Sequence, residues 1–206
     1  RGEQKRITVT GKKLEEFLGK KRAYHDKKID TAVPGVVTGL AYTSAGGEIL
    51  FVEARLIPGD GGLIITGQLG DVMKESVQIA VSLAKSLYPK QAELFKENTL
   101  HIHVPAGAVP KDGPSAGITI TTAIVSALTG KTVSTELAMT GEISLRGSVL
   151  PIGGLPEKLM AAQRAGIKKV LIPAPNVPDL SEVAEEVREK LEIIPVERVT
   201  DVLKRV

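Results

Sequence analysis

Residues 109–117 read Val-Pro-Lys-Asp-Gly-Pro-Ser-Ala-Gly, and this glycine-rich turn leads directly into an apolar helical run that reaches Leu128. A serine placed where a turn opens into a helix lies beside backbone N–H groups that the helix leaves unpaired. Such N–H groups can stabilise the negative oxygen that forms when a hydroxyl attacks a carbonyl carbon. The segment therefore makes Ser115 a candidate nucleophile.

The positions of the histidines limit how Ser115 can be activated. His25, His101 and His103 all precede the serine, which excludes a hydrolase with the chain order serine, acid, histidine. The order histidine, acid, serine is formally open through His101 or His103 and Asp112. However, an aspartate three residues before the serine has little freedom to reach behind an imidazole.

A neutral lysine is the remaining way to activate the serine. Free lysine titrates near ~10.4, so a base at neutral pH needs its pKa lowered by about three units, or roughly 4 kcal/mol. Burial lowers the pKa this far only when no carboxylate pairs with the amine. Lys158 is the candidate because apolar residues follow it, while the adjacent Glu157 points about 100° away around the helix. A solvated helix lysine stays open as the alternative.

Composition excludes several other classes. The 206 residues are 42% hydrophobic, enough for one sizeable core or two small joined ones. No apolar run approaches the roughly 18 residues of a membrane span, so we expect no membrane partner. The chain has no cysteine, which excludes disulfides, thiolate metal sites and a cysteine nucleophile. The absence of cysteine and of an apolar leader fits a cytoplasmic protein.

The net charge of +3 is unevenly distributed, because residues 1–28 hold ten Lys and Arg against four acids. Such an arm can contact nucleic acid or an acidic neighbouring domain, or it can be a solvated linker. Aromatic residues make up 3% of the chain and provide few platforms for stacking single-stranded bases.

The hydrophobic pattern predicts strands that first form hairpins and later alternate with helices, so we expect an α+β fold, α/β-like, with mixed β-sheets and packed helices. The expected strands are 7–10, 36–42, 48–57, 63–67, 100–104, 137–145, 169–172 and 192–196. The expected helices are one capped by Asp71 with apolar positions from Val72 to Leu87, one from the Ser115 turn to Leu128, 156–165, 181–191 and a last turn capped by Thr200.

Three weaker motifs carry no function on inspection. Residues 130–132 resemble the end of a P-loop, but Val125 occupies the position of its first glycine. Residues 82–85 match S-x-x-K in the middle of a predicted helix, where no turn exposes the serine. His101 and His103 share one strand face, but no third metal ligand is evident nearby, so no metal site is expected.

Four blocks together resemble the proteolytic domain of Lon proteases. They are residues 66–73, 110–117, 138–143 (Ala-Met-Thr-Gly-Glu-Ile) and 153–159 (Gly-Gly-Leu-Pro-Glu-Lys-Leu). The resemblance extends from about Pro34 to the C-terminus. It implies a fold of the ribosomal protein S5 domain 2-like type.

The resemblance also implies a serine endopeptidase with a Ser–Lys dyad, in which Ser115 is the nucleophile and Lys158 the base. It implies that the Thr140 hydroxyl orients the amine, and it matches Glu53 to an acidic residue near the site. Tyr42 stands where many relatives have tryptophan. The supporting residues of the serine loop are Lys111, Asp112, Gly113 and Pro114.

Full-length Lon proteins also carry a substrate domain and an ATPase module. The resemblance therefore implies that residues 1–30 are a basic connector from a missing ATPase module, and that residues 31–206 are the protease domain. It implies no cofactor in this domain, with ATP and Mg in the missing module. The implied partners are unfolded or damaged proteins, a homo-oligomer that is a hexamer in the full-length protein, and possible DNA contact through other domains.

Two other classes stay open from the sequence alone. One is a catalytically silent Lon-like binding domain of a DNA-repair ATPase, which the presence of both Ser115 and Lys158 disfavours. The other is a small-molecule kinase of related architecture, which would use the glycine-rich turns for phosphate.

Overall fold

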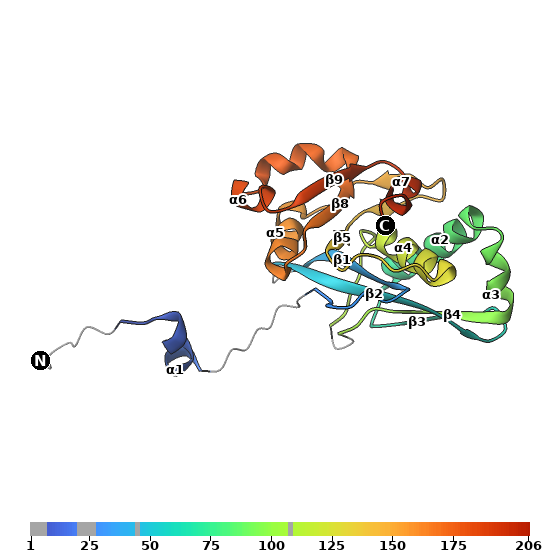
Figure 1. The fold of residues 1–206 in the computed structure, drawn as a ribbon, viewed down its shortest axis with the longest axis horizontal. Coiled ribbons are helices and arrows are strands. Elements are labelled where there is room, and N and C mark those ends of the chain that lie inside the picture. Colours follow the sequence, from blue (N-terminus) through green and yellow to red (C-terminus); the bar gives the residue numbers. More distant parts are fainter. Residues whose placement is uncertain (1–7, 20–27, 44–45, 107–108) are drawn as a thin grey trace, which may run out of the picture.

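The computed structural model describes residues 8–19, 28–43, 46–106 and 109–206 (Figure 1). In this part of the chain, a mixed sheet has the strand order β3-β4-β2-β1-β5-β8-β9, and β6 and β7 form a separate hairpin. The strands are β1 (Val36–Thr43), β2 (Gly46–Pro58), β3 (Leu63–Thr66), β4 (Asn98–His103), β5 (Leu137–Met139), β6 (Glu142–Ile143), β7 (Val149–Leu150), β8 (Lys169–Pro173) and β9 (Glu192–Val196).

The helices cover both faces of the sheet. The α-helices are α1 (Leu14–Leu18), α2 (Asp71–Leu87), α3 (Leu94–Glu97), α4 (Gly117–Thr129), α5 (Leu155–Ala165), α6 (Glu185–Arg188) and α7 (Val199–Leu203). The 3₁₀ helices are Gly11–Lys13, Gln91–Glu93 and Ala174–Glu182.

Two hydrophobic cores lie on opposite faces of the sheet because successive strand residues point to opposite sides. Val37 and Val52 face the larger core, which contains α2, α4 and α7. Leu40 and Ile49 face the smaller core, which contains α5 and α6. The helix α4 is buried on nearly every side, so it is the central helix of the domain. These observations confirm the expected mixed-sheet fold.

The β1–β2 hairpin and the short strand β5 together shape the region of the site. β1 pairs antiparallel with β2 along its whole length, from Val36 opposite Glu53 to Thr43 opposite Gly46. On its other edge β1 pairs with β5 only at Thr38 and Gly39. Among the described residues, Leu40, Ala41 and Tyr42 of β1 therefore have no strand partner on the β5 side and form an open edge there.

The expected strand 137–145 was wrong as a single element. It is broken at Thr140 and Gly141 into β5 and β6. The Thr140 N–H donates to the Leu171 carbonyl and the Gly141 N–H to the Ser115 carbonyl, at 3.1 and 2.8 Å. The first bond continues the ladder between β5 and β8, whereas the second attaches the chain to the segment before α4 and takes it out of the sheet.

The expected helix 181–191 was also wrong. A 3₁₀ helix ends at Glu182, Val183 and Ala184 are extended, and α6 spans four residues. Val183, Val187 and Leu191 are buried in the smaller core, so their spacing resembles that of a helix. The chain therefore buries these three side chains without forming a continuous helix.

The ends of several elements also differ from expectation. Gly70, not Asp71, precedes α2 as its cap residue, and Ser115 lies before α4, whose cap residue is Ala116. Arg198 is the cap residue of α7, and Asp201 rather than Thr200 bonds its backbone. Of the expected strand 7–10, residue 7 lies outside the described residues, and residues 8–10 are not a strand.

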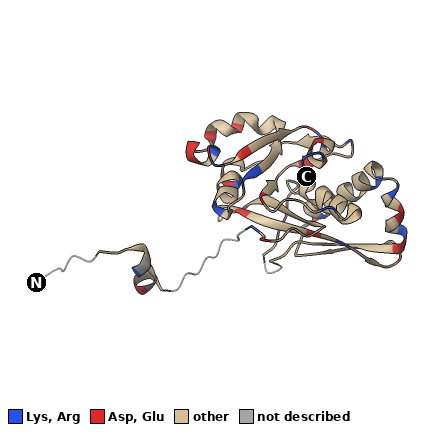
Figure 2. Cartoon of the chain, viewed as in Figure 1, with Lys and Arg blue, Asp and Glu red and all other residues tan. Residues whose placement is uncertain are grey.

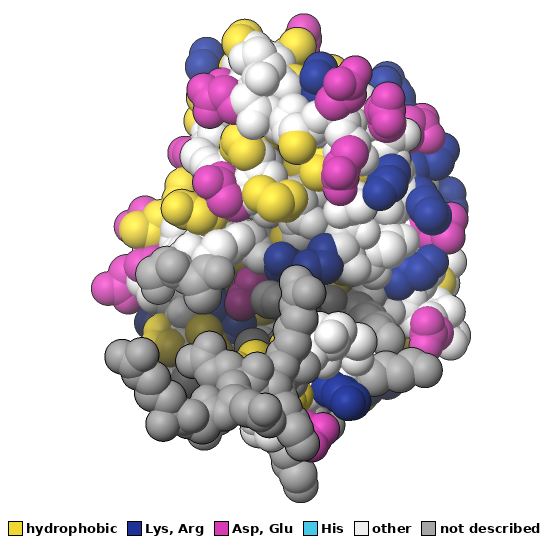
Figure 3. Space-filling view, turned by 90° about the vertical axis from the view of Figure 1, so that its left-hand side faces the viewer, with side chains coloured by type: hydrophobic (Ala, Val, Ile, Leu, Met, Phe, Trp, Pro, Cys, Tyr) yellow, Lys and Arg dark blue, Asp and Glu magenta, His cyan; other side chains and the backbone are white. Residues whose placement is uncertain are grey.

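In the ribbon of Figure 2, Lys, Arg, Asp and Glu are spread over helices, turns and strands, and long stretches of the ribbon carry none of them. Figure 3 shows acidic and basic side chains interspersed on the face that it displays. Much of the basic run that the sequence places in residues 20–28 lies outside the described residues. In the described chain, no helix combines the length and the hydropathy needed to span a bilayer.

Candidate active site

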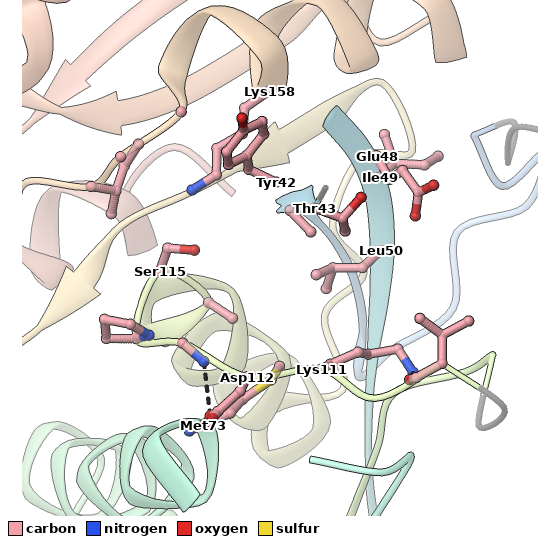
Figure 4. Close-up of a pocket in the computed structure, with 18 of the residues that line it drawn as sticks. Tyr42, Thr43, Glu48, Ile49, Leu50, Met73, Lys111, Asp112, Ser115 and Lys158 are labelled. Atoms are coloured by element: carbon pink, nitrogen blue, oxygen red, sulfur yellow. Dashed lines mark hydrogen bonds between the residues drawn. The ribbon is translucent and has the colours of Figure 1, made fainter. Parts of the chain in front are cut away.

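A cavity of about 890 Å³ brings the two candidate catalytic residues together. Its walls are the β1–β2 hairpin, the segment that precedes α4 and the turn 151–154 that precedes α5. Ser115 lines it from the start of α4, and Lys158 lines it from the first turn of α5 (Figure 4). Residues 43 positions apart in sequence thus share one space, as the dyad requires.

Ser115 is fixed through its own backbone. Its carbonyl oxygen accepts hydrogen bonds from the Gly141 N–H at 2.8 Å and from the Thr140 hydroxyl at 3.3 Å. The Ile118 N–H donates in turn to the Gly141 carbonyl at 3.1 Å. The break between β5 and β6 therefore holds the serine at the entrance of α4, with its side chain half-buried in the cavity wall.

Lys158 is almost completely buried, with 2% of its surface exposed. Its Nζ donates a hydrogen bond to Thr140 Oγ1 at 3.2 Å, and none of the ion pairs among the described residues includes it. Burial lowers the pKa of the Lys158 amine from its ordinary value of 10.5 to about 8. The amine is therefore still mostly protonated at neutral pH, but a far larger fraction of it is neutral, and able to accept a proton, than in a free lysine.

Thr140 connects the two candidates. Its hydroxyl accepts from the Lys158 amine and donates to the Ser115 carbonyl, and the residue is fully buried. With its proton committed to that carbonyl, the hydroxyl oxygen presents a lone pair to the amine. This geometry orients the amine within the cavity.

The residues just before Ser115 bind the segment that leads into α2. The Asp112 carboxylate accepts hydrogen bonds from the N–H groups of Met73 and Gly113, at 3.0 and 2.8 Å (Figure 4). It therefore caps α2 in place of Gly70, which has no side chain; a Cβ there would lie 2.3 Å from the Asp112 carboxyl carbon.

These contacts restrict which N–H groups can stabilise an oxyanion. The Gly113 N–H is engaged by Asp112, and Pro114 has none. Within the described chain, the Ser115 N–H forms no hydrogen bond. It is therefore free to donate to a negative oxygen that develops beside the serine.

Glu53 lies outside the set of residues that line the cavity. It is in the middle of β2, opposite Val36 and His103. A different carboxylate, that of Glu48, lies at the cavity (Figure 4). Its proximity was missed from the sequence, and strand alternation gives no signal for it, because Ile49 and Phe51 on the opposite face of β2 line the cavity as well.

The remaining sequence candidates occupy well-defined positions. The half-exposed Tyr42 ring lies against Gly154, at the turn that leads into α5. His101 and His103 both contact the Thr66 hydroxyl, at 2.9 and 2.7 Å, on the outer strands of the sheet. Among the described residues, no group of three or more histidine or acidic side chains is placed to hold a metal ion.

Residues 8–206 match the family model of the Lon protease (S16) C-terminal proteolytic domain. The chain is 64% identical over 191 residues to a Lon protease of Clostridium beijerinckii, covering 93% of this chain and 24% of the relative. It is 53% identical over 201 residues to one of Fervidobacterium nodosum, covering 97% and 25%. A Lon protease of Methanosarcina barkeri is 52% identical over 193 residues, covering 93% and 24%. The chain spans about a quarter of the length of these relatives.

Proposed function

This chain belongs to the Lon protease family, as its C-terminal proteolytic domain, and from that premise we propose that it hydrolyses peptide bonds with Ser115 as nucleophile and Lys158 as base. The observation that carries the proposal is the state of Lys158: a buried amine with no carboxylate partner in the described chain, held by Thr140 in the cavity that Ser115 lines.

In the proposed reaction, neutral Lys158 takes the proton of the Ser115 hydroxyl as its oxygen attacks a peptide carbonyl carbon. The Ser115 N–H, with that of Asp112 as the other available donor of residues 112–115, stabilises the resulting oxyanion. The Lys158 ammonium then protonates the leaving amine, and the neutral amine later activates the water that hydrolyses the acyl-enzyme. Thr140 keeps the amine directed at the serine throughout, and no cofactor is needed for these steps.

The open edge of β1 is the proposed position of the substrate backbone. Ala41 and Tyr42 line the cavity and lie beyond the two residues of β1 that pair with β5. An extended peptide can add to such an edge through backbone hydrogen bonds, which do not depend on sequence. Side-chain pockets in the cavity would add a mild preference.

The properties of the whole protein are proposed from the length and names of the relatives. Residues 1–30 would be a basic connector to an ATPase module, which would use ATP and Mg²⁺ to deliver unfolded or damaged proteins to residues 31–206. We place the protein in the cytoplasm, as a homo-oligomer that is hexameric at full length, with any DNA contact made by other domains.

The test compares the parent with Ser115→Ala and Lys158→Met in cleavage of casein and of a short fluorogenic peptide. Both variants are expected to lose cleavage by more than about 1,000-fold, since serine and base act as a unit. Ser82→Ala and Lys85→Met, which alter the S-x-x-K motif of α2, are the matched controls and should cleave like the parent. A parent that cleaves nothing, even with an ATPase module supplied, would support the silent-domain alternative.

A further inference from the structure

Lys111 makes an unusual set of contacts for a lysine at the edge of an active site. Its Nζ donates hydrogen bonds to three backbone carbonyls, those of Ala106 at 2.8 Å, Val109 at 3.0 Å and Gly67 at 3.1 Å. An ammonium group has three N–H donors and each of them has an acceptor here. The side chain therefore ties the loop before the serine to the turn before α2.

The backbone of Lys111 reinforces the same junction. Its N–H donates to the Gln68 carbonyl at 3.0 Å, and its carbonyl accepts from the Gly70 N–H at 2.8 Å. The next residue, Asp112, caps α2 through the Met73 N–H. The chain is thus attached to segment 67–73 at successive positions immediately before Ser115, whose own carbonyl is held from the other side.

The backbone that these bonds hold is conformationally costly. Ala106 and Gln68 have positive φ values of 63° and 58°, which non-glycine residues seldom adopt. Such conformations persist only where surrounding contacts impose them, at a cost of about 1–3 kcal/mol each. The Lys111 amine bonds the carbonyl of Ala106 itself and the carbonyl of Gly67, the neighbour of Gln68.

The Lys111 amine does not take part in the chemistry itself. Figure 4 shows that its side chain extends away from Ser115 along the loop. All its donors are engaged by carbonyls, whereas the base of a dyad must reach the nucleophile. Any effect of Lys111 on catalysis must therefore act through the position of the loop.

We propose that Lys111 is a positioning residue whose ammonium group gathers three carbonyls to hold the loop of Ser115, and the N–H groups beside it, in reactive geometry. The inference rests on the proposed role of Ser115 as nucleophile. It assigns to Lys111 a catalytic effect through geometry, distinct from proton transfer by Lys158.

Lys111→Met keeps the length of the side chain and removes all three donors. We expect kcat for a short fluorogenic peptide to fall by about 10- to 100-fold, as misplacement of a reacting group by about 1 Å does. KM should change by less than about threefold, because substrate binding along β1 is untouched. Backbone amides of residues 109–117 should exchange faster with solvent than in the parent, a measurement that does not depend on turnover.

The absence of cysteine from the chain permits a specific rescue. Lys111→Cys should behave like Lys111→Met, and alkylation of its thiol with 2-bromoethylamine installs an ammonium at about the reach of lysine. This treatment should restore both kcat and slow amide exchange. Lys131→Cys, at an exposed lysine after α4, is the control and should match the parent before and after alkylation.

Three outcomes would overturn the inference: a kcat of Lys111→Met within twofold of the parent, unchanged amide exchange, or no recovery on alkylation of a Lys111→Cys variant whose circular dichroism shows it folded. These results are distinct from failure of the proposed function. In that case Ser115→Ala would cleave like the parent, whatever Lys111 does.

Discussion

Two lysines in one cavity wall have opposite tasks because their surroundings differ. Lys111 is partly exposed and its amine is surrounded by carbonyl oxygens, which favour the charged form. Burial alone nevertheless lowers its pKa below 10.5. Lys158 is buried with one hydroxyl partner, and its pKa falls further, to about 8. The first is suited to hold backbone and the second to accept a proton.

The pKa of Lys158 predicts the pH dependence of acylation. Below about pH 8 the amine is mostly protonated and cannot accept the serine proton, so single-turnover acylation should rise with pH through an apparent pKa near 8. Well above this value the rate should level off, because the base is then fully neutral. Stopped-flow measurements of acylation between pH 6 and 10 check this, and a rate that is flat across that range would contradict it.

Thr140→Val should show whether the Thr140 hydroxyl orients the Lys158 amine, because the variant keeps Lys158 itself unchanged. The substitution keeps the shape but removes the hydroxyl that bonds both Lys158 and the Ser115 carbonyl. We expect kcat to fall by about 10- to 100-fold with little change in KM, since the amine loses its direction. Thr140→Ser keeps the hydroxyl and should retain most of the activity. Equal losses in the two variants would show that the methyl group, not the hydroxyl, matters.

At the scale of elements, the site is built where regular structure stops. The Thr140 N–H still bonds Leu171 of the neighbouring strand β8, whereas the Gly141 N–H bonds the Ser115 carbonyl, outside the sheet, so β5 does not continue past this point. The helix α2 begins at a glycine and receives its capping carboxylate from the serine loop. Each interruption serves to attach one element to the loop of Ser115.

Asp112→Ala should destabilise α2 and with it the domain. The loss of the carboxylate leaves the Met73 N–H without its acceptor, and a lost helix cap costs about 1 kcal/mol of the free energy of unfolding. Asp71→Ala, in the same first turn, removes only an exposed ion pair with Lys74 and should cost less. Urea denaturation of the two variants measures the difference, and equal losses would contradict the capping role.

At the scale of the whole molecule, the two catalytic candidates come from opposite faces of the sheet. Ser115 is carried by α4, which packs in the larger core, and Lys158 by α5, which packs in the smaller one. Thr140 passes between them as the chain leaves β5. Their alignment therefore depends on both cores being packed at once.

Gly47→Ala should test whether stability depends on the close packing of the β1–β2 hairpin against α5. A Cβ at Gly47 would lie within van der Waals overlap of the Glu157 carbonyl oxygen, which belongs to the first turn of α5. We expect a loss of at least about 2 kcal/mol in the free energy of unfolding, because backbone has to shift. Gly153→Ala, where nothing lies within 4 Å of the added Cβ, is the matched control for stability. Thermal unfolding that is the same for both variants would contradict the close approach.

Much of the fold followed from local pattern. The helix α2 covers the expected apolar positions from Val72 to Leu87, and the bounds of α5 agree with expectation within one residue, since the apolar spacing, proline and glycine act within each segment. The break at Thr140 and Gly141 could not be predicted, because the Gly141 N–H bonds the carbonyl of Ser115, which is distant in sequence. The helix predicted for residues 181–191 was wrong for a related reason. Apolar side chains at helical spacing can be buried by contacts with the neighbouring core without a continuous helix.

The sequence by itself determined which groups are available for chemistry: a serine at a turn, a lysine among apolar residues and no histidine after the serine. The residue types and their order in the chain do not change on folding. Only the tertiary structure decided that the Lys158 amine is desolvated without a counter-charge, that it bonds the Thr140 hydroxyl, and that the Lys111 amine bonds three backbone carbonyls. Desolvation and hydrogen-bond geometry depend on atoms brought together from distant segments, and no local pattern records their distances.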